Sequence, residues 1–225
     1  MKKIICLLLI IGCSFALFAC DDGSTTQTPP PETEKLPDAE FFDMVALSDP
    51  NKITTQTTTA DKATSKSYSG TYETLIADDG TVVYNYEYQY AREASLENLG
   101  ELGSTAVKSG TVLYANGLYS EDNGQTWVAG APDVDIISVK LDLNREYIGE
   151  YKMSKDGKTL TTTVSAENAA KILGISVNAT SDVTIKIYTN GTYLSRISVD
   201  YSNKNATIKI DTSYNYVPAE EIPEV

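Results

Sequence analysis

Residues 67–90 read SYSGTYETLIADDGTVVYNYEYQY, which is two alternating runs on either side of Asp78-Asp79-Gly80. Polar and apolar residues alternate with a period of two, as is typical of antiparallel strands that bury one face. A three-residue loop with Gly80 in the left-handed conformation would close this hairpin. That loop length predicts these facing pairs: Ile76 with Val82, Thr74 with Tyr84, Tyr72 with Tyr86, Gly70 with Tyr88, and Tyr68 with Tyr90.

The second run carries four alternate tyrosines, and we expect one of them to cover the bare backbone of Gly70. Such a tyrosine ladder has two interpretations. It is either a wall of the core with hydroxyls at the rim, or the lining of a half-open apolar groove. Trp127, the only tryptophan, follows a turn and would either face a ligand or anchor the core. The candidate ligand-binding residues are therefore Tyr72, Tyr84, Tyr86, Tyr88, Tyr90 and Trp127.

Further turn signals separate strand-length runs and indicate an antiparallel meander. They are Asn116-Gly117, Asp122-Asn123-Gly124, Asp156-Gly157, Asn190-Gly191 and Ser202-Asn203-Lys204-Asn205. A two-residue turn at Asn203-Lys204 would pair Tyr201 with Ala206 and Val199 with Ile208. At Asn190-Gly191 we prefer a three-residue loop, which pairs Ile185 with Ser195, over a two-residue loop, which pairs Ile185 with Arg196. The Thr-rich segment 51–67 is predicted to be an edge strand.

Two helices are predicted beside these strands. Residues 38–48 place Phe41, Met44 and Val45 at helical spacing before Asp49-Pro50 ends the run. Residues 165–174 begin with a serine cap and end at a glycine, and their apolar face holds Ala166, Ala169, Ala170 and Leu173. Segments 91–102 (weak helix or acidic loop) and 134–144 (alternating like a strand) are ambiguous.

The N-terminus pairs two lysines, Lys2 and Lys3, with a short apolar run that ends in Leu17-Phe-Ala-Cys20. This pattern resembles the lipobox of bacterial lipoproteins, in which the cysteine becomes the first mature residue and carries a diacylglyceryl group. Residues 1–19 are then a signal peptide, and Cys20 is the lipid attachment site. The alternative is a plain secretory signal with an incidental cysteine. The Pro/Thr-rich segment 20–37 is predicted to be a tether, and residues 38–225 the domain.

Composition excludes several classes of function. The chain has 18 basic and 31 acidic side chains and no histidine, so the usual general base and most zinc or iron sites are absent. Cys6 and Cys13 fall in the predicted signal peptide, which leaves neither a disulfide nor a thiol nucleophile in the mature chain. The negative charge argues against a nucleic-acid partner.

No cofactor or metal site is predicted either. The acidic turns Asp78-Asp79 and Glu121-Asp122-Asn123 offer oxygens to calcium, but they lack the ligand spacing of an EF-hand loop. A glycosidase needs only two suitably placed carboxylates, and no pair stands out among the acids. We therefore expect a protein that is not an enzyme.

The order of elements also resembles a known family. The predicted helix and paired strands are followed by LYSEDNGQTW (residues 118–127), the Asp156-Gly157 hairpin, the second helix, and the ending IKIDTSYNYVPAEEIP (residues 208–223). This order is similar to the lipoprotein-carrier superfamily (LolA/LppX type). The resemblance implies a half-open sheet closed by helices over an apolar cavity that takes acyl chains. No diagnostic motif accompanies it, so no family site residue is carried over.

Together these patterns predict a mainly β (α+β) domain, with a curved antiparallel sheet or half-open β-barrel and the two helices packed on it. The expected function is that of an extracytoplasmic lipoprotein, anchored to the membrane by acyl chains such as palmitate. It would bind an apolar ligand, either a lipid or the acyl chains of another lipoprotein. The alternative is a surface module with a packed core that binds a protein or glycan. The oligomeric state stays open.

Overall fold

One antiparallel sheet of eleven strands dominates the computed structural model, which describes residues 38–92, 105–132 and 137–218. These residues all belong to the unit Glu34–Val225. The strands are β1 (Lys52–Asp61), β2 (Ser67–Ile76), β3 (Val82–Ala91), β4 (Thr105–Ala115), β5 (Leu118–Ser120), β6 (Val128–Ala129), β7 (Tyr151–Met153), β8 (Thr159–Val164), β9 (Val183–Thr189), β10 (Leu194–Ser202) and β11 (Ala206–Asn215).

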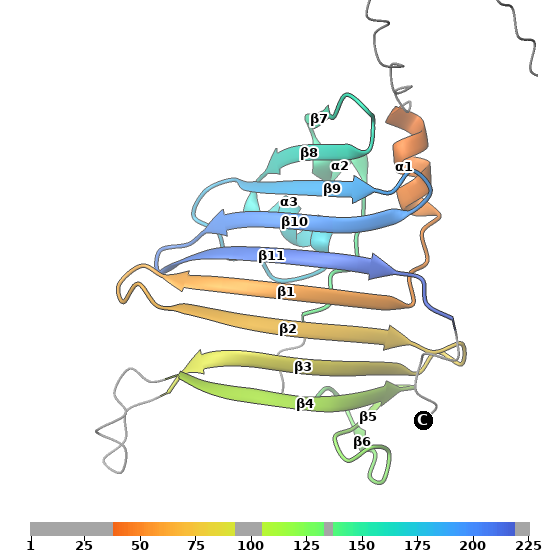
Figure 1. Cartoon of the computed structure of the whole chain (residues 1–225), viewed down its shortest axis with the longest axis vertical. Coiled ribbons are helices and arrows are strands. Elements are labelled where there is room, and N and C mark those ends of the chain that lie inside the picture. Colours follow the sequence, from red (N-terminus) through yellow and green to blue (C-terminus); the bar gives the residue numbers. More distant parts are fainter. Residues whose placement is uncertain (1–37, 93–104, 133–136, 219–225) are drawn as a thin grey trace, which may run out of the picture. The chain divides into compact units, whose positions relative to one another are not determined.

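The strand order is β6-β5-β4-β3-β2-β1-β11-β10-β9-β8-β7, so the sheet is open, with β6 and β7 at its edges (Figure 1). The predicted edge strand 51–67 is wrong in position, because β1 lies in the middle of the sheet between β2 and β11. The burial of its residues alternates. Ile53 and Thr55 are buried, and the Thr55 hydroxyl lies 3.1 Å from the Thr212 hydroxyl on β11.

The β2–β3 hairpin is confirmed. Its ladder runs from Gly70 opposite Tyr88 to Ile76 opposite Val82, so the predicted pair Tyr68–Tyr90 lies beyond it. Gly80 has φ +84°, a left-handed conformation that glycine adopts without strain. The turn is held by the backbone N–H of Thr81, which donates to the Asp79 carboxylate at 2.8 Å.

The register of the last two hairpins differs from the prediction. Val199 faces Ile210 and Tyr201 faces Ile208, because Asn203 is the first residue of the turn and its Oδ1 accepts from the N–H of Asn205 and Ala206. A shift by two residues leaves every side chain on its predicted face.

In the β9–β10 hairpin, the preferred three-residue loop is wrong. Asn190 N–H donates to Tyr193 O at 3.0 Å across a two-residue loop, and a register irregularity follows between Leu194 and Arg196. Ile185 therefore faces Val199, and neither of the two predicted partners is correct.

The helices are α1 (Asp38–Ala46), α2 (Arg145–Ile148) and α3 (Ala166–Leu173). Both predicted helices are confirmed, and α2 is an additional short one. The Ser165 hydroxyl caps α3 by accepting from Asn168 N–H at 3.3 Å, and Gly174 ends the helix with φ +65°. Its buried residues are Ala169, Ile172 and Leu173. Ile172, rather than the expected Ala166 and Ala170, therefore completes the buried face of this helix.

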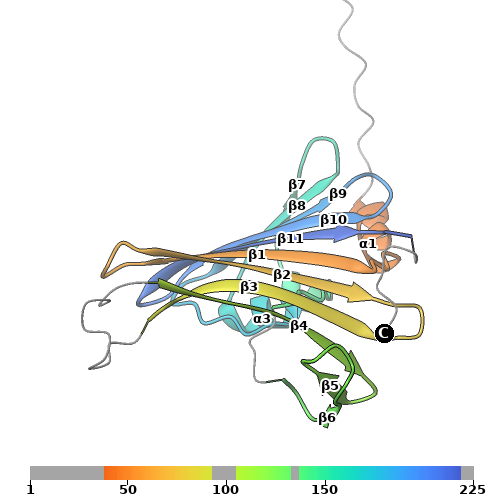
Figure 2. The same cartoon turned by 60° about the horizontal axis from the view of Figure 1, so that its bottom comes forward.

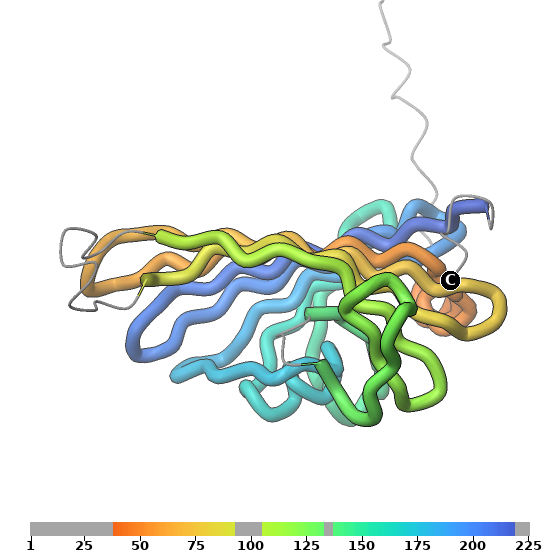
Figure 3. The backbone as a smooth tube through the Cα atoms, turned by 90° about the horizontal axis from the view of Figure 1, so that it is seen from below, coloured from red at the N-terminus to blue at the C-terminus, as the bar shows by residue number. Residues whose placement is uncertain are grey.

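The sheet curves, and Figures 2 and 3 show α3 and the β5–β6 hairpin on the same side of it. We call this side the inner face. The opposite, outer face carries ion pairs such as Lys52–Glu73 at 2.7 Å and Arg196–Asp211 at 2.6 Å. It also holds a small buried apolar cluster of Leu75, Val83 and Leu113 on β2, β3 and β4. Apart from this cluster, the division into an apolar inner face and a mostly polar outer face follows from the period of two in the strands.

Segment 137–144 is not a strand, although its burial alternates. It lies against the end of α3, where Lys140 N–H donates to Leu173 O at 3.2 Å and Asp142 N–H donates to Ile172 O at 2.8 Å. Val139 is fully buried there. The remainder of this predicted segment, and most of segment 91–102, lies outside the described residues.

Candidate ligand-binding cavity

The inner face has two parts that differ in packing. Under β8, β9 and β10 it is filled by side chains from α2, α3 and segment 137–144. The fully buried residues of this packed part include Leu160, Ile172, Leu173, Ile185, Ile187, Ile197 and Val199. Tyr214 of β11 closes it, because its hydroxyl donates to Val139 O at 3.1 Å and its ring is 5% exposed. This burial raises the pKa of Tyr214 and keeps the phenol neutral.

Under β1–β4 the inner face is not filled, and a half-open cavity of about 970 Å³ lies there. Its floor is formed by alternate residues of the sheet, beginning with Thr57, Thr59, Tyr68, Tyr72, Tyr84 and Tyr88. Tyr114, Tyr201, Ile208 and Ile210 continue the floor on β4, β10 and β11. The cavity therefore borders the packed part along β11.

The roof comes from two segments that are irregular in structure. Ala131 and Pro132 follow β6, and Ile137, Ser138 and Lys140 belong to the segment hydrogen-bonded to α3. Gly174, Ile175 and Ser176 directly follow α3. A Cβ added at Gly174 would lie 3.1 Å from Lys140 O, so these two roof segments pack backbone to backbone.

The tyrosines of the floor lie against one another. The rings of Tyr72 and Tyr88 are stacked, with centroids 6.2 Å apart and planes 20° apart, and Tyr86 and Tyr90 flank Tyr88 at 6.0 and 6.2 Å. Offset contacts of this kind stabilise aromatic clusters and hold the rings in place. The floor is therefore built of aromatic rings that carry hydroxyl groups.

Two glycines let these rings lie flat on the sheet. A Cβ at Gly70 would approach the Thr57 hydroxyl to 2.8 Å and Tyr72 Cε2 to 2.9 Å, and one at Gly110 would approach the Tyr86 hydroxyl to 2.6 Å. We expected a tyrosine of β3 to cover Gly70, whereas the nearest atoms belong to Thr57 and Tyr72. Tyr86 covers Gly110 instead.

Tyr84 and Tyr201 of the cavity are held in their neutral form. Burial, and secondarily Tyr114 nearby, raises the pKa of Tyr84, and burial also raises the pKa of Tyr201. Lys140 is the one charged side chain among the described lining residues. The buried hydroxyl of Ser138 has no hydrogen-bond partner among the described residues. The described lining thus offers apolar rings, hydroxyl groups and one cation.

The comparison with known proteins gives a likeness in structure only. No family model matches the chain, and no curated protein matches it. A solved structure does. It is the crystal structure of a LolA superfamily protein from Nitrosomonas europaea, with 83% of this chain and 95% of that chain covered, at 10% sequence identity and a TM-score of 0.29.

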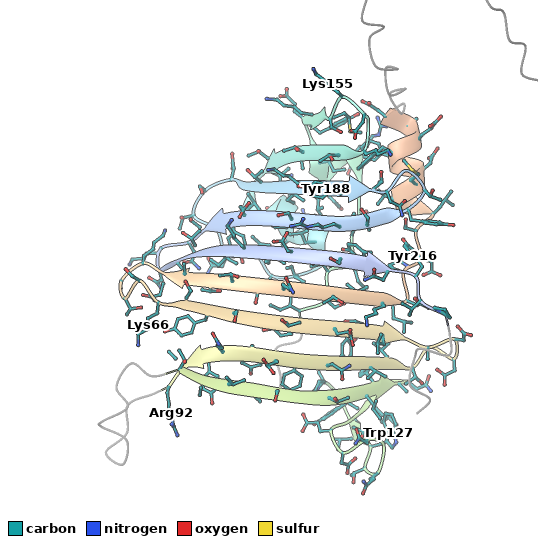
Figure 4. The ribbon with its side chains drawn as sticks, viewed as in Figure 1. Lys66, Arg92, Trp127, Lys155, Tyr188 and Tyr216 are labelled. Atoms are coloured by element: carbon teal, nitrogen blue, oxygen red, sulfur yellow. The ribbon has the colours of Figure 1, made fainter. Side chains whose placement is uncertain are left out.

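Three of the six candidate ligand-binding residues line the cavity: Tyr72, Tyr84 and Tyr88. Tyr86 covers Gly110, and Tyr90 is 44% exposed near the end of β3. Trp127 lies in the β5–β6 hairpin beyond β4, 37% exposed, so it anchors no core (Figure 4). Neither Tyr86, Tyr90 nor Trp127 lines the cavity.

The sequence analysis missed the rest of the lining. Alternation could have found Tyr114 and Tyr68, because they lie opposite Val82 and Thr59 on the inner face. It could not have found the roof, whose position depends on hydrogen bonds to α3 rather than on a period.

The remaining expectations concern the anchor and metals. Cys20 lies outside the described residues. Among the helices that are described, none has the length and hydropathy to cross a bilayer. Within the same residues no cluster of His, Cys, Asp and Glu side chains could hold a metal ion. Asp122 accepts hydrogen bonds from the Ser120 hydroxyl and Thr126 N–H, which lower its pKa to about 2 and make it part of a turn.

Proposed function

We propose that this chain is an extracytoplasmic lipoprotein, anchored to a membrane through Cys20, whose sheet binds an apolar ligand in the cavity without catalysis. The ligand is a lipid or the acyl chains of another lipoprotein. The observation that carries this proposal is the cavity of about 970 Å³ beneath the tyrosine floor, beside a part of the inner face that is packed solid.

The cavity favours ligand binding over the alternative of an interaction module with a packed core. A sheet that only presented an edge or a loop to a partner would gain stability by filling its inner face throughout, because unfilled apolar space costs free energy. Here the inward-facing residues of β8–β10 are fully covered by packed side chains, while Tyr84 and Tyr88 on β3 are only half-buried.

The anchor is supported by the sequence alone. Leu17-Phe-Ala-Cys20 follows a short apolar run, and the Pro-rich segment 20–37 separates Cys20 from α1. Two or three acyl chains, each contributing about 0.8 kcal/mol per buried CH₂, would hold the protein on a membrane stably. The tether would let the cavity receive a ligand from the membrane or from another protein.

A pair of variants on β1 tests binding in the cavity. Thr59 lines the cavity, and its neighbour Thr58 lies on the outer face opposite Lys209. Thr59→Trp should occupy the floor, whereas Thr58→Trp should leave it free. If the indole displaces two methylenes of a bound chain, the loss is about 1.6 kcal/mol, or about fifteenfold in Kd.

The measurement is the displacement of a neutral fluorescent probe, N-phenyl-1-naphthylamine, by single-chain lipids of increasing length. Each added CH₂ should lower Kd about fourfold until the cavity is full. Native mass spectrometry of the purified protein should also show a lipid bound one to one. Absence of binding, or equal binding by Thr58→Trp and Thr59→Trp, would contradict the proposal.

A further inference from the structure

The one charged side chain among the described lining residues is opposite in sign to the net charge of the chain. The full sequence carries 31 acidic and 18 basic side chains, yet the described lining residues include one lysine, Lys140, and no carboxylate. A cavity for a neutral lipid would not need this sign, and one for a cationic lipid would need the reverse. A positive charge in an acidic protein attracts a negatively charged group.

Lys140 is held firmly in the roof. Its N–H donates to Leu173 O at 3.2 Å, and its carbonyl and Cβ lie 3.1 and 3.6 Å from the position that a Cβ at Gly174 would take. The end of α3 therefore fixes where this side chain starts.

The Lys140 ammonium group makes no ion pair with another described residue. Three other lysines of the domain do: Lys52 with Glu73, Lys171 with Glu167, and Lys209 with Asp200. The charge of Lys140 is thus available to a ligand.

The floor supplies both ends of an amphiphile with suitable partners. Ile208 and Ile210 of β11 belong to the packed cluster, 9% and 3% exposed, and border the cavity as apolar lining residues. Tyrosine and threonine hydroxyl groups can donate hydrogen bonds to an acceptor, and the buried Ser138 hydroxyl, two residues from Lys140, still lacks a partner among the described residues. Lysine and hydroxyl donors together fit a head group that only accepts hydrogen bonds.

We propose that the cavity selects an amphiphile with a negatively charged head group, which Lys140 binds while the acyl chain lies over Ile208 and Ile210. This inference rests on the proposed function, since it names the class of ligand for the same cavity. A fatty-acid carboxylate and the phosphate of a single-chain phospholipid share the required chemistry. Both offer anionic oxygens at one end of an acyl chain.

The test compares ligands that have the same chain and different head groups. Laurate, lauroyl lysophosphatidylglycerol and the neutral monolauroylglycerol each displace N-phenyl-1-naphthylamine from the intact protein at neutral pH. We expect the anionic ligands to bind about fivefold more tightly than the neutral one, the upper end for a solvent-exposed ion pair. This preference should shrink as salt is added.

Variants of one residue assign the preference. Lys140→Gln should abolish it and leave the Kd of monolauroylglycerol unchanged, Lys140→Arg should keep it, and Lys155→Gln, in the exposed β7–β8 turn outside the cavity, should have no effect. A preference for laurate alone identifies the carboxylate, and one for the lysophospholipid alone identifies the phosphate. Equal Kd values for all three ligands, or a preference that survives Lys140→Gln, would overturn the inference while leaving the proposed function standing. Failure of all three ligands to bind would overturn both.

Discussion

Substituting Gly110 by alanine should reveal how tightly the tyrosines are packed on the sheet. A Cβ at this position would lie 2.6 Å from the hydroxyl oxygen of Tyr86 and 2.9 Å from its Cζ, so the ring has to move. Overpacking of this kind costs about 1–3 kcal/mol, while replacing a strand glycine by alanine otherwise gains about 0.5–1 kcal/mol. Gly110→Ala should therefore destabilise the domain by about 1 kcal/mol.

The sign should reverse once the ring is removed. In the background of Tyr86→Ala, the alanine at position 110 meets no tyrosine, and it should stabilise the domain by about 0.5–1 kcal/mol. Urea unfolding of the four proteins, followed by circular dichroism, measures the coupling, which should be about 1–3 kcal/mol. Ser109→Ala, on the outer face of the same strand, is the control and should change stability by less than about 0.5 kcal/mol. Equal effects of Gly110→Ala in both backgrounds would refute the packing described for Tyr86.

Three further predictions concern the elements that hold the cavity. Ile172→Ala should destabilise the domain by about 2–5 kcal/mol, measured by urea unfolding, because Ile172 is fully buried where α3 meets the sheet. Ser165→Ala should cost about 1 kcal/mol in the same assay through loss of the N-cap, and Ser165→Asp should restore it. The pKa of Asp122 is lowered from 3.8 to about 2 in the folded protein. Its carboxylate should therefore stabilise the β5–β6 hairpin fully above pH 3.8 and lose that effect as the pH falls through 2. NMR titration of this carboxyl group measures the pKa, and a value near 3.8 would contradict the prediction.

The fold was largely predictable where the turn residues leave little choice. Asp78-Asp79-Gly80 sets the register of β2 and β3, because a three-residue loop places Tyr72 opposite Tyr86 and Ile76 opposite Val82 on one face. The β9–β10 hairpin was not predictable in this way, since its register irregularity after Leu194 carries no sequence signal. The place of β1 beside β11 is a contact between distant parts of the chain, which local alternation does not encode.

The candidate site was predictable in part for the same reason. Alternation assigned the face of Tyr72, Tyr84 and Tyr88 correctly, and all three residues line the cavity. Tyr86 lies on the same face, yet its ring packs over Gly110. This could not be predicted without knowing that β4 pairs with β3. The roof, including Lys140, follows from tertiary hydrogen bonds to the end of α3. The anchor at Cys20 and the nature of the ligand stay predictions.

Photo-crosslinking most directly tests whether an acyl chain occupies the cavity. A laurate with a diazirine at its terminal carbon would be irradiated with the protein, and the labelled residues identified by mass spectrometry. The account predicts saturable labelling of inner-face residues such as Tyr201, Ile208 and Ile210, suppressed by unlabelled laurate and by Thr59→Trp. Labelling confined to the outer face, for example Tyr188, or labelling that does not saturate, would contradict it.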